Sequence, residues 1–209
     1  MSAEAHTERR RRTDGERSRQ AILREAARLA TVEGVDGLSL GRLADAVGMS
    51  KSGLFAHFKS KEELQLATIE TADEIFEDVI VTPALRADPG VARLEAFADR
   101  FIAHLRDEVF PGGCFFASTA AELGPREGPV RDRAVQTLFR WTGLIQAEVT
   151  EAQANGELDP SLDAGQLAFE LNAYLLLANA QFIAMGGELP LERAQQAFAA
   201  RLSAARSGS

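Results

Sequence analysis

Residues 40–58 constrain the fold of this chain more than any other stretch, because they predict two short helices joined by a tight turn. Four apolar residues recur at the i, i+3, i+4 and i+7 positions that form one face of a helix: Leu40, Leu43, Ala44 and Val47. Gly48 follows, and glycine readily adopts the left-handed conformation in which many helices end. Ser50 is placed to cap a second helix with its hydroxyl. The pattern predicts a helix-turn-helix unit.

We expect the second helix over residues 51–58, with Leu54 and Phe58 turned inward. Its outward face combines small residues with one cation: Lys51, Ser52, Gly53, Phe55 and Ala56. Small residues allow a helix to approach DNA closely, and the positive N-terminal end of a helix favours phosphate. A helix-turn-helix unit places such a helix in the major groove. Taken alone, the pair is also compatible with an ordinary corner between two packed helices.

The longer run of residues 18–66 resembles the N-terminal DNA-binding domain of the TetR family of bacterial repressors. The resemblance has no gap and includes a first helix with Ile22, Ala26 and Leu29 inside, the helix-turn-helix unit, and the entry to a fourth helix. Two positions depart from the family: Gly53 stands where Thr is frequent, and Phe55 where Tyr is usual. Phe55 lacks the hydroxyl that commonly reaches phosphate, although its ring can contact a thymine methyl group.

Eight residues form the predicted DNA-contacting set: Ser39, Arg42, Lys51, Ser52, Gly53, Phe55, His57 and Lys61. We expect Ser39 to cap the first helix of the unit near the DNA backbone, and Arg42 to reach phosphate or a base edge. Lys61 resembles the family's phosphate-contacting lysine, or is simply an exposed residue of a first helical turn. His57 either contacts phosphate, as the matching family position does, or stacks behind the helix. A two-fold homodimer of such heads would read an inverted-repeat operator in double-stranded DNA.

The charge of the chain divides along its length. The net charge is -8, but residues 1–60 carry 11 Lys and Arg against 8 Asp and Glu, a net +3, while residues 61–209 carry 12 against 23, a net -11. DNA repels an acidic body, so the basic part should make the phosphate contacts. We therefore predict a disordered basic arm over residues 1–17, a DNA-binding domain over 18–66, and a ligand-binding and dimerisation domain over 67–209. The arm, with four consecutive arginines, is either a DNA-seeking extension or a solvated tail.

The composition fits an all-α cytoplasmic protein. Hydrophobic residues make up 45% of the 209 residues, which is enough for a buried core, and only seven are proline. A single cysteine excludes an intramolecular disulfide and fits a reducing compartment. The polar start of the chain has no apolar signal-peptide core, and we expect no apolar run of membrane-spanning length.

Turn residues divide the rest of the chain into further helices. A capping box at Ser60 and Glu63 begins a helix that should reach about Ile80, with Pro83 ending or kinking it. More helices are predicted near residues 91–109, 113–123, 129–154, 162–185 and 190–205, about nine in all. The resemblance implies that the fourth helix is the lever of induction and that the last two helices form the dimer. The 162–185 helix has a wide apolar surface suited to this: Leu167, Leu171, Tyr174, Leu175, Ala178, Phe182 and Met185.

Ten residues of the body are candidates for a small-molecule effector site, because pockets between helices combine apolar walls with a few polar groups. They are Phe97, Phe101, His104, Cys114, Phe115, Phe116, Trp141, Asn172, Tyr174 and Asn179. Ordinary core packing also explains each aromatic residue among them. Asn172 and Asn179 lie on an otherwise apolar helix, and a buried amide needs partners. These partners would come from the dimer interface, from neighbouring backbone or from a ligand.

We expect no catalytic residues. Cys114 lies at a predicted helix N-terminus, which would lower the pKa of its thiol, but no histidine has a spacing that identifies a partner. One cysteine and three scattered histidines make no metal-binding cluster, and no phosphate-cradling glycine loop is present, so neither metal nor cofactor is expected. Cys114 is then a buried core residue, a redox-sensing thiol or, as an alternative function, the nucleophile of a thiol-dependent enzyme.

The predicted function is a ligand-responsive DNA-binding transcription regulator. As a repressor, it would release its operator when a small molecule binds the C-terminal domain. The alternative from another class is a helical interaction module that keeps this fold without specific DNA recognition.

Overall fold

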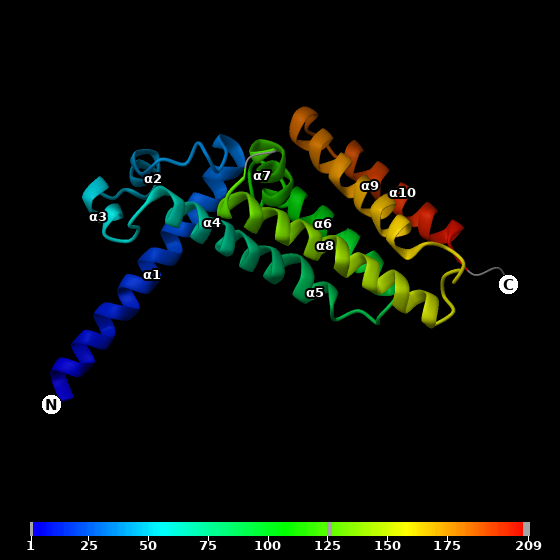
Figure 1. Cartoon of the computed structure of the whole chain (residues 1–209), viewed down its shortest axis with the longest axis horizontal. Coiled ribbons are helices and arrows are strands. Elements are labelled where there is room, and N and C mark those ends of the chain that lie inside the picture. Colours follow the sequence, from blue (N-terminus) through cyan, green and yellow to red (C-terminus); the bar gives the residue numbers. More distant parts are fainter. Residues whose placement is uncertain (1, 125–126, 207–209) are drawn as a thin grey trace.

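The computed structural model describes residues 2–124 and 127–206, with side chains described from Gly15 onward. These residues are mostly helical (Figure 1), and their one β interaction is an isolated bridge between Leu158 and Arg206. The elements are α1 (Ser2–Glu33), α2 (Leu40–Val47), α3 (Lys51–Phe55), α4 (Lys61–Phe76), the π-helical segment η1 (Glu77–Val81), α5 (Thr82–Ala84), α6 (Val91–Arg106), α7 (Phe115–Leu123), α8 (Pro129–Ala154), α9 (Ala164–Met185) and α10 (Leu189–Ala204). Since α4, η1 and α5 follow without a break, they count as one of nine helical runs in these residues. The predicted all-α fold is confirmed.

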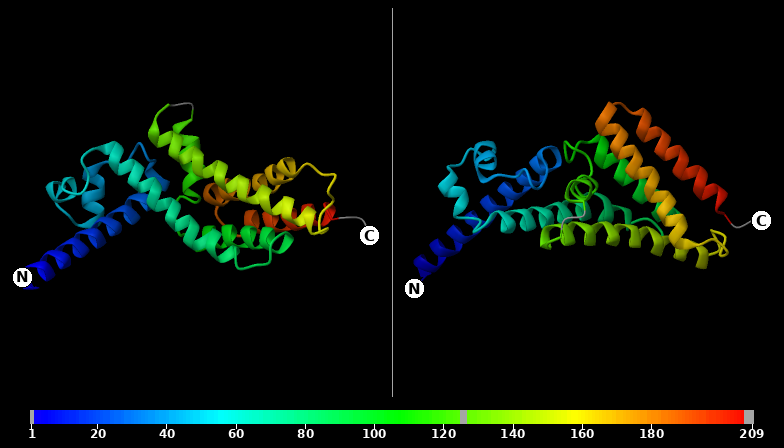
Figure 2. Two further views of the ribbon diagram at one scale, coloured as in Figure 1. Left: turned by 60° about the horizontal axis from the view of Figure 1, so that its bottom comes forward. Right: turned by 45° about the horizontal axis from the view of Figure 1, so that its top comes forward.

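Helices α1 to α3 and the start of α4 form a head at one end of the molecule (Figures 1 and 2). Its core is made of apolar side chains from these elements: Ile22, Ala26, Leu43, Leu54, Phe58 and Leu64. The predicted caps are confirmed, because Ser39 Oγ accepts from the Arg42 N–H at 3.2 Å and Ser50 Oγ accepts from the Gly53 N–H at 3.1 Å. Gly48 ends α2 with a φ of 67°, the left-handed conformation that the turn requires.

Helix α3 is shorter than predicted, since it ends at Phe55 and not at Phe58. The chain tightens there, and the His57 N–H donates to the Leu54 carbonyl oxygen three residues back at 3.0 Å. This turn carries Phe58 into the core, where the guanidinium of Arg19 lies 4.6 Å from the centre of its ring. The inward placement of Leu54 and Phe58 is as predicted, and both are fully buried.

Helix α1 is longer than predicted, because it continues back to Ser2 through the stretch expected to be a disordered arm. Figure 1 shows this N-terminal part projecting away from the rest of the molecule. The stretch contains no proline and several good helix formers, so a helix already formed by packed residues extends into it at little cost. The side chains of the four arginines lie outside the described side chains.

Helix α4 joins the head to the body. Ser60 Oγ accepts from the Glu63 N–H at 3.0 Å as predicted, but the Glu63 carboxylate accepts from the N–H of Lys59 at 2.9 Å and not from that of Ser60. The helical run continues through η1 and ends at Ala84, just after Pro83. Pro83 lies in the first turn of α5, where its missing N–H costs least.

The body consists of α4's C-terminal half and helices α6 to α10. Helix α8 packs against α4, α6, α7 and α9, and α10 packs against α9 and α6. Asp73 of α4 accepts from Arg133 of α8 at 3.0 Å and also pairs with Arg140, so α4 is fixed to α8 by charge as well as by packing. Head and body share one continuous apolar core.

Helix α9 differs in part from its prediction, because it exposes Met185 of the predicted dimer surface but buries four other residues of that surface. Of the surface predicted for dimerisation, Leu167, Leu171, Leu175 and Ala178 are buried in the core of their own chain. The large apolar side chains that α9 does expose are Phe169, Leu177, Ile183 and Met185. The helix is apolar on nearly all sides, so its periodicity could not identify the inward face.

The expectation that no apolar run reaches membrane-spanning length is wrong for α9 by length and composition alone. Among the described residues, it is the one helix that meets this criterion. Core helices of soluble proteins also meet it, and α9 packs against α6, α8 and α10.

Candidate functional site

The outward side of the helix-turn-helix unit brings together most residues of the predicted DNA-contacting set. Exposed among them are Ser39, Arg42, Lys51, Ser52, Phe55 and Lys61. Ser50 Oγ caps α3 and lies 3.2 Å from Ser52 Oγ, so two hydroxyls stand at the N-terminal end of the second helix. This end of the unit presents hydroxyls, N–H groups and a lysine, all of which bind phosphate oxygens.

Arg42 is held by a carboxylate of the first helix. Its guanidinium forms an ion pair with Glu33, and Nε lies 3.4 Å from Glu33 Oε2. The hydrogen bond from Arg42 lowers the pKa of the Glu33 carboxyl group, while the pKa of Arg42 is raised. Arg42 would therefore have to leave Glu33 to reach phosphate or a base edge.

The two lysines of the predicted set also contact the protein. Lys61 Nζ donates to the carbonyl oxygen of Asp36 at 2.7 Å, which joins the start of α4 to the α1–α2 connection. The Lys51 side chain lies over Gly41, where a Cβ atom would be 3.3 Å from Lys51 Cε. Both ammonium groups stay at the surface of the head.

The central part of α3 has little bulk at its exposed side apart from one ring. A Cβ atom on Gly53 would lie 3.2 Å from Ser50 Oγ, so the absence of a side chain leaves room for the capping hydroxyl. Phe55 is 56% exposed. His57 is half-buried, with its ring centre 6.3 Å from that of Phe58, so the ring lies beside the core of the head.

In the body, six of the ten predicted effector residues form one buried aromatic cluster. Its members are Phe97, Phe101, His104, Phe115, Phe116 and Trp141, joined by Phe76 and Phe110. Phe76, at the end of α4, meets Trp141 edge-to-face with ring centres 5.2 Å apart and Phe116 at 5.8 Å. The last residue of α4, before the run continues as η1, thus lies inside the cluster.

A small cavity lies within this cluster. Its walls are Phe76, Phe101, Cys114, Phe116, Thr137, Leu138, Trp141 and Leu176, and its volume is about 10 Å³. That is roughly the room needed by one water molecule. No charged side chain lines it, so a larger occupant would have to move the walls and would find an almost wholly apolar surface.

The side chains of Asn172 and Asn179 form hydrogen bonds inside the body, whereas Tyr174 lies outside the aromatic cluster. Asn172 Oδ1 accepts from the indole N–H of Trp141 at 3.0 Å, and Asn179 Oδ1 accepts from the Cys114 N–H at 2.8 Å. From α9, Asn172 therefore orients Trp141 of the cluster, and Asn179 holds the N-cap residue of α7. Tyr174 lines a separate groove between α9 and α10, which also includes Leu177 and Arg193.

His104 is the polar member of the aromatic cluster. It is 3% exposed, and neither ring nitrogen has a hydrogen-bond partner among the described residues. Burial lowers the pKa of His104 to about 4, against the opposing effect of the Asp107 charge, so the ring is neutral near pH 7. A buried imidazole without a protein partner is unusual, because buried polar groups are normally hydrogen-bonded.

Cys114 is buried, and burial raises the pKa of its thiol, although the backbone N–H groups of Ala117 and Phe116 act in the opposite direction. The expected lowering of this pKa at a helix N-terminus is therefore wrong, because desolvation has the larger effect. The thiol is protonated near neutral pH, which is unfavourable for a nucleophile. Within the described part of the chain, no three His, Cys, Asp or Glu side chains are grouped as a metal site.

Comparison with known proteins agrees with this geometry. The family model "Bacterial regulatory proteins, tetR family" matches residues 22–68, and the "Tetracyclin repressor-like, C-terminal domain" model matches residues 90–198. The chain belongs to the TetR family. It is a DNA-binding transcription regulator, and the resemblance seen in the sequence is confirmed.

Individual TetR-family proteins are similar over most of their length. The HTH-type transcriptional repressor ComR of Escherichia coli K12 is 27% identical over 160 residues, which cover 75% of each chain. A TetR transcriptional regulator from Chloroflexus aurantiacus has a TM-score of 0.84 at 28% identity, covering 91% of this chain and 96% of that one. AibR, solved with isovaleryl coenzyme A and operator DNA, shares the fold at a TM-score of 0.67 and 23% identity, covering 85% and 94%.

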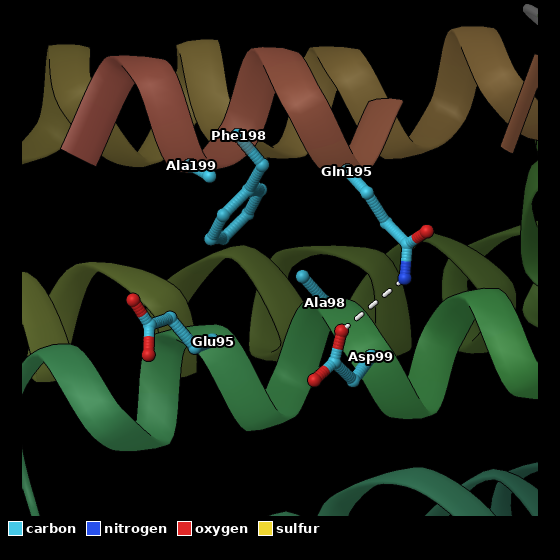
Figure 3. A pocket seen from close by; sticks show the side chains of 6 residues that line it. All are labelled: Glu95, Ala98, Asp99, Gln195, Phe198 and Ala199. Carbon is cyan, nitrogen blue, oxygen red and sulfur yellow. Dashed lines mark hydrogen bonds between the residues drawn. The ribbon is translucent and has the colours of Figure 1, made fainter. Parts of the chain in front are cut away.

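A third hollow of this TetR-family chain lies between α6 and α10 (Figure 3). Glu95 and Asp99 project from α6, and the ring of Phe198 points down from α10 between the two helices. Asp99 accepts a hydrogen bond from Gln195 at 3.4 Å. This hollow is open and contains none of the predicted site residues, so the aromatic cluster remains the candidate effector site.

Two members of the cluster, Phe76 and Phe110, were not predicted. Phe76 lies on α4 four residues after buried Ala72, so the helical periodicity of α4 could have predicted that Phe76 faces inward. Phe110 precedes Pro111 in a connection between helices, where periodicity gives no information. Glu122 was also missed, although its carboxylate bonds to backbone of the head.

Proposed function

We propose that this regulator is a cytoplasmic homodimeric repressor that binds an inverted-repeat operator and releases it when a small molecule enters the aromatic cluster. The observation that carries the proposal is the capped α2–α3 pair, which exposes Lys51, Ser52 and Phe55 on one side of the head. The acidic charge of residues 61–209 supports a body that stays away from the duplex. With its thiol protonated and buried, Cys114 supports a regulator without catalytic activity.

The exposed side of α9 supports the dimer. Phe169, Leu177, Ile183 and Met185 are large apolar side chains at the surface of a single chain, and apolar groups gain free energy when a partner covers them. A two-fold pairing through α9 and α10 would hold two heads at a fixed spacing. Recognition helices that enter successive major grooves on one face of DNA lie about 34 to 36 Å apart.

The aromatic cluster supports an effector that is small, mostly apolar and uncharged. Its cavity has no charged wall, and His104 offers an unpaired N–H and an unpaired nitrogen acceptor nearby, within ring contact of Phe76 and Phe101. Transfer of an ion into such a site without a partner is costly. Because Phe76 ends α4, an occupant that displaces its ring would also displace the helix that carries the head.

A selection from genomic DNA fragments with the purified protein tests this function. We expect recovered fragments to share an inverted repeat that the protein protects from cleavage. Lys51→Glu should abolish recovery, because it reverses the charge at the N-terminus of α3, whereas Arg86→Glu makes the same charge change at an exposed site of the body and should have little effect. Recovery of random sequence by the wild type would contradict specific recognition.

A further inference from the structure

Helix α7 is attached to the head at both of its ends, and it also forms one wall of the aromatic cluster. We propose that Glu122 of α7 is a positioning residue that couples occupation of the cluster to the orientation of the head, alongside the lever helix α4. This inference rests on the proposed function, because it concerns how the same effector site is read by the DNA-binding head.

At the C-terminal end of α7, the Glu122 carboxylate holds the connection between α1 and α2. Oε2 accepts from the Val35 N–H at 2.7 Å, and Oε1 accepts from the Asp36 N–H at 2.8 Å. A Cβ atom on Gly34 would lie 2.6 Å from Glu122 Oε1, and Gly34 has a φ of 83°, a conformation that favours glycine. We call Glu122 with the N–H groups of Val35 and Asp36 the Glu122 clamp.

The opposite side of the same connection is held by α4. Gln65 Nε2 donates to the carbonyl oxygen of Val35 at 2.9 Å, and Lys61 Nζ donates to that of Asp36 at 2.7 Å. The N–H groups of the connection thus point to the body and its carbonyl groups to the lever helix. A change at the Glu122 clamp would therefore shift the backbone that Lys61, a predicted phosphate contact, binds.

At the N-terminal end of α7, the loop before the helix contacts α1. The Gly112 N–H donates to Thr31 Oγ1 at 3.0 Å, and Arg28 Nη1 donates to the carbonyl oxygen of Val109 at 3.1 Å. A Cβ atom on Gly112 would lie 1.9 Å from the carbonyl oxygen of Thr31, so loop and helix backbone touch. Helix α7 cannot shift without disturbing at least one of its two attachments to the head.

The cavity lies against this helix. Cys114, the N-cap of α7, and Phe116, in its first turn, line the cavity, and Phe115 packs on Phe116 with ring centres 5.3 Å apart. Packed cores shift as units and do not deform continuously. An occupant larger than about 10 Å³ would therefore push α7 as a whole and strain the Glu122 clamp.

A first experiment examines the free protein by amide hydrogen exchange. Leu138→Phe adds bulk to the cavity from α8 without altering α7, and Leu144→Phe is the same change on α8 outside the cavity walls. We expect exchange at the Val35 and Asp36 amides to rise about tenfold in Leu138→Phe and to stay unchanged in Leu144→Phe. Equal exchange in wild type and a folded Leu138→Phe variant would overturn the coupling, whether or not an operator exists.

A second experiment uses the one tryptophan of the chain, Trp141, as a reporter inside the cluster. Coupling between two sites is reciprocal, so operator DNA bound at the head should change Trp141 emission. In Glu122→Gln the amide keeps one acceptor oxygen and turns an NH₂ group towards the second N–H, so the clamp loses a bond. We expect this variant to bind the selected operator but to lose most of the emission change. The same substitution at Glu151, an exposed residue of α8, should retain it.

Failure of the proposed function and failure of the Glu122 coupling would give different experimental results. If the wild type binds no specific DNA, the proposed function is wrong, and hydrogen exchange in Leu138→Phe still decides the coupling. If the wild type binds its operator and Glu122→Gln shows the full Trp141 response, the Glu122 clamp is a local structural contact and the inference is wrong. Glu122→Asp, whose shorter side chain keeps the charge, should give an intermediate response.

Discussion

The ring centre of His104 lies 5.5 Å from that of Phe110 and 6.3 Å from that of Phe101, so an imidazole occupies a site whose neighbours are hydrocarbon. His104 was one of the ten sequence candidates because pockets between helices combine apolar walls with a few polar groups. The sequence could not predict that both nitrogens lack partners, since this depends on elements brought together from distant parts of the chain. At the residue scale, the sequence does not predict which single polar groups are buried without a partner.

His104 should make stability depend on pH. Its folded-state pKa, about 4, lies below the 6.5 of an exposed imidazole, so the unfolded chain binds the proton first. The contribution of neutral His104 to the free energy of unfolding is therefore fully present above pH 6.5. It is lost as the pH falls towards 4. Between those values we expect wild type to lose about 3 kcal/mol more unfolding free energy than His104→Leu. Urea titrations across this range measure it, and parallel curves would contradict a neutral buried imidazole.

Gly48 and Gly15 offer a matched pair of glycine substitutions. A Cβ atom would meet nothing within 4 Å at either position, so only backbone conformation differs between them. Gly48 has a φ of 67°, whereas Gly15 lies within helix α1. Gly48→Ala should destabilise the protein by about 1 kcal/mol, and Gly15→Ala should stabilise the helix by up to about 1 kcal/mol. Equal effects in thermal unfolding would show that the turn does not require a left-handed residue.

The salt dependence of DNA binding distinguishes two possible roles of the Lys61 side chain. If its ammonium group leaves the Asp36 carbonyl oxygen to bind phosphate, Lys61→Met should weaken binding to all DNA sequences and reduce the slope of log K against log salt by about 0.9. If it only holds the α1–α2 connection, the affinity falls but the slope stays the same. Fluorescence anisotropy at several salt concentrations distinguishes these results, and an unchanged slope removes Lys61 from the DNA-contacting set.

At the element scale, the sequence predicted best those helices whose ends are marked by side chains. Ser39, Ser50 and Ser60 cap α2, α3 and α4 through local hydrogen bonds, and Gly48 ends α2 in a left-handed conformation, so their roles were readable without tertiary information. The end of α3 was misplaced because the burial of Phe58 required a turn that periodicity does not encode. The dimer surface predicted on α9 included four residues that are buried within the chain, because the helix is apolar on both faces.

The exposed side of α9 gives a test of dimerisation. Leu177→Glu places a carboxylate on a residue that is 58% exposed in the single chain, so the chain itself should still fold. In a dimer through α9 that carboxylate would be buried without a partner, which is costly. We expect monomers by analytical ultracentrifugation. Phe139→Glu, at an exposed apolar position on α8, should leave the dimer intact, and a dimeric Leu177→Glu protein would exclude α9 from the interface.

At the scale of the whole molecule, the division into a basic head and an acidic body was visible in the charge along the chain, and the family resemblance predicted the fold. The ten candidate effector residues were chosen by residue type, and six of them lie in one cluster. The contacts between head and body were not predictable, because the Glu122 clamp joins residues 86 and 87 positions apart through backbone N–H groups. Any residue type except proline supplies such groups, so no sequence pattern marks them.

In the proposed function, two heads held at a fixed spacing by one dimer read one operator. The most direct measurement is the affinity of wild type for the selected operator and for the same duplex with about five base pairs inserted between its halves, which is about half a helical turn. The insertion leaves every base contact of each head available but moves the second half-site to the opposite face of the DNA. We expect affinity to fall to the level of random DNA. Unchanged affinity for the lengthened operator would contradict the two-fold account.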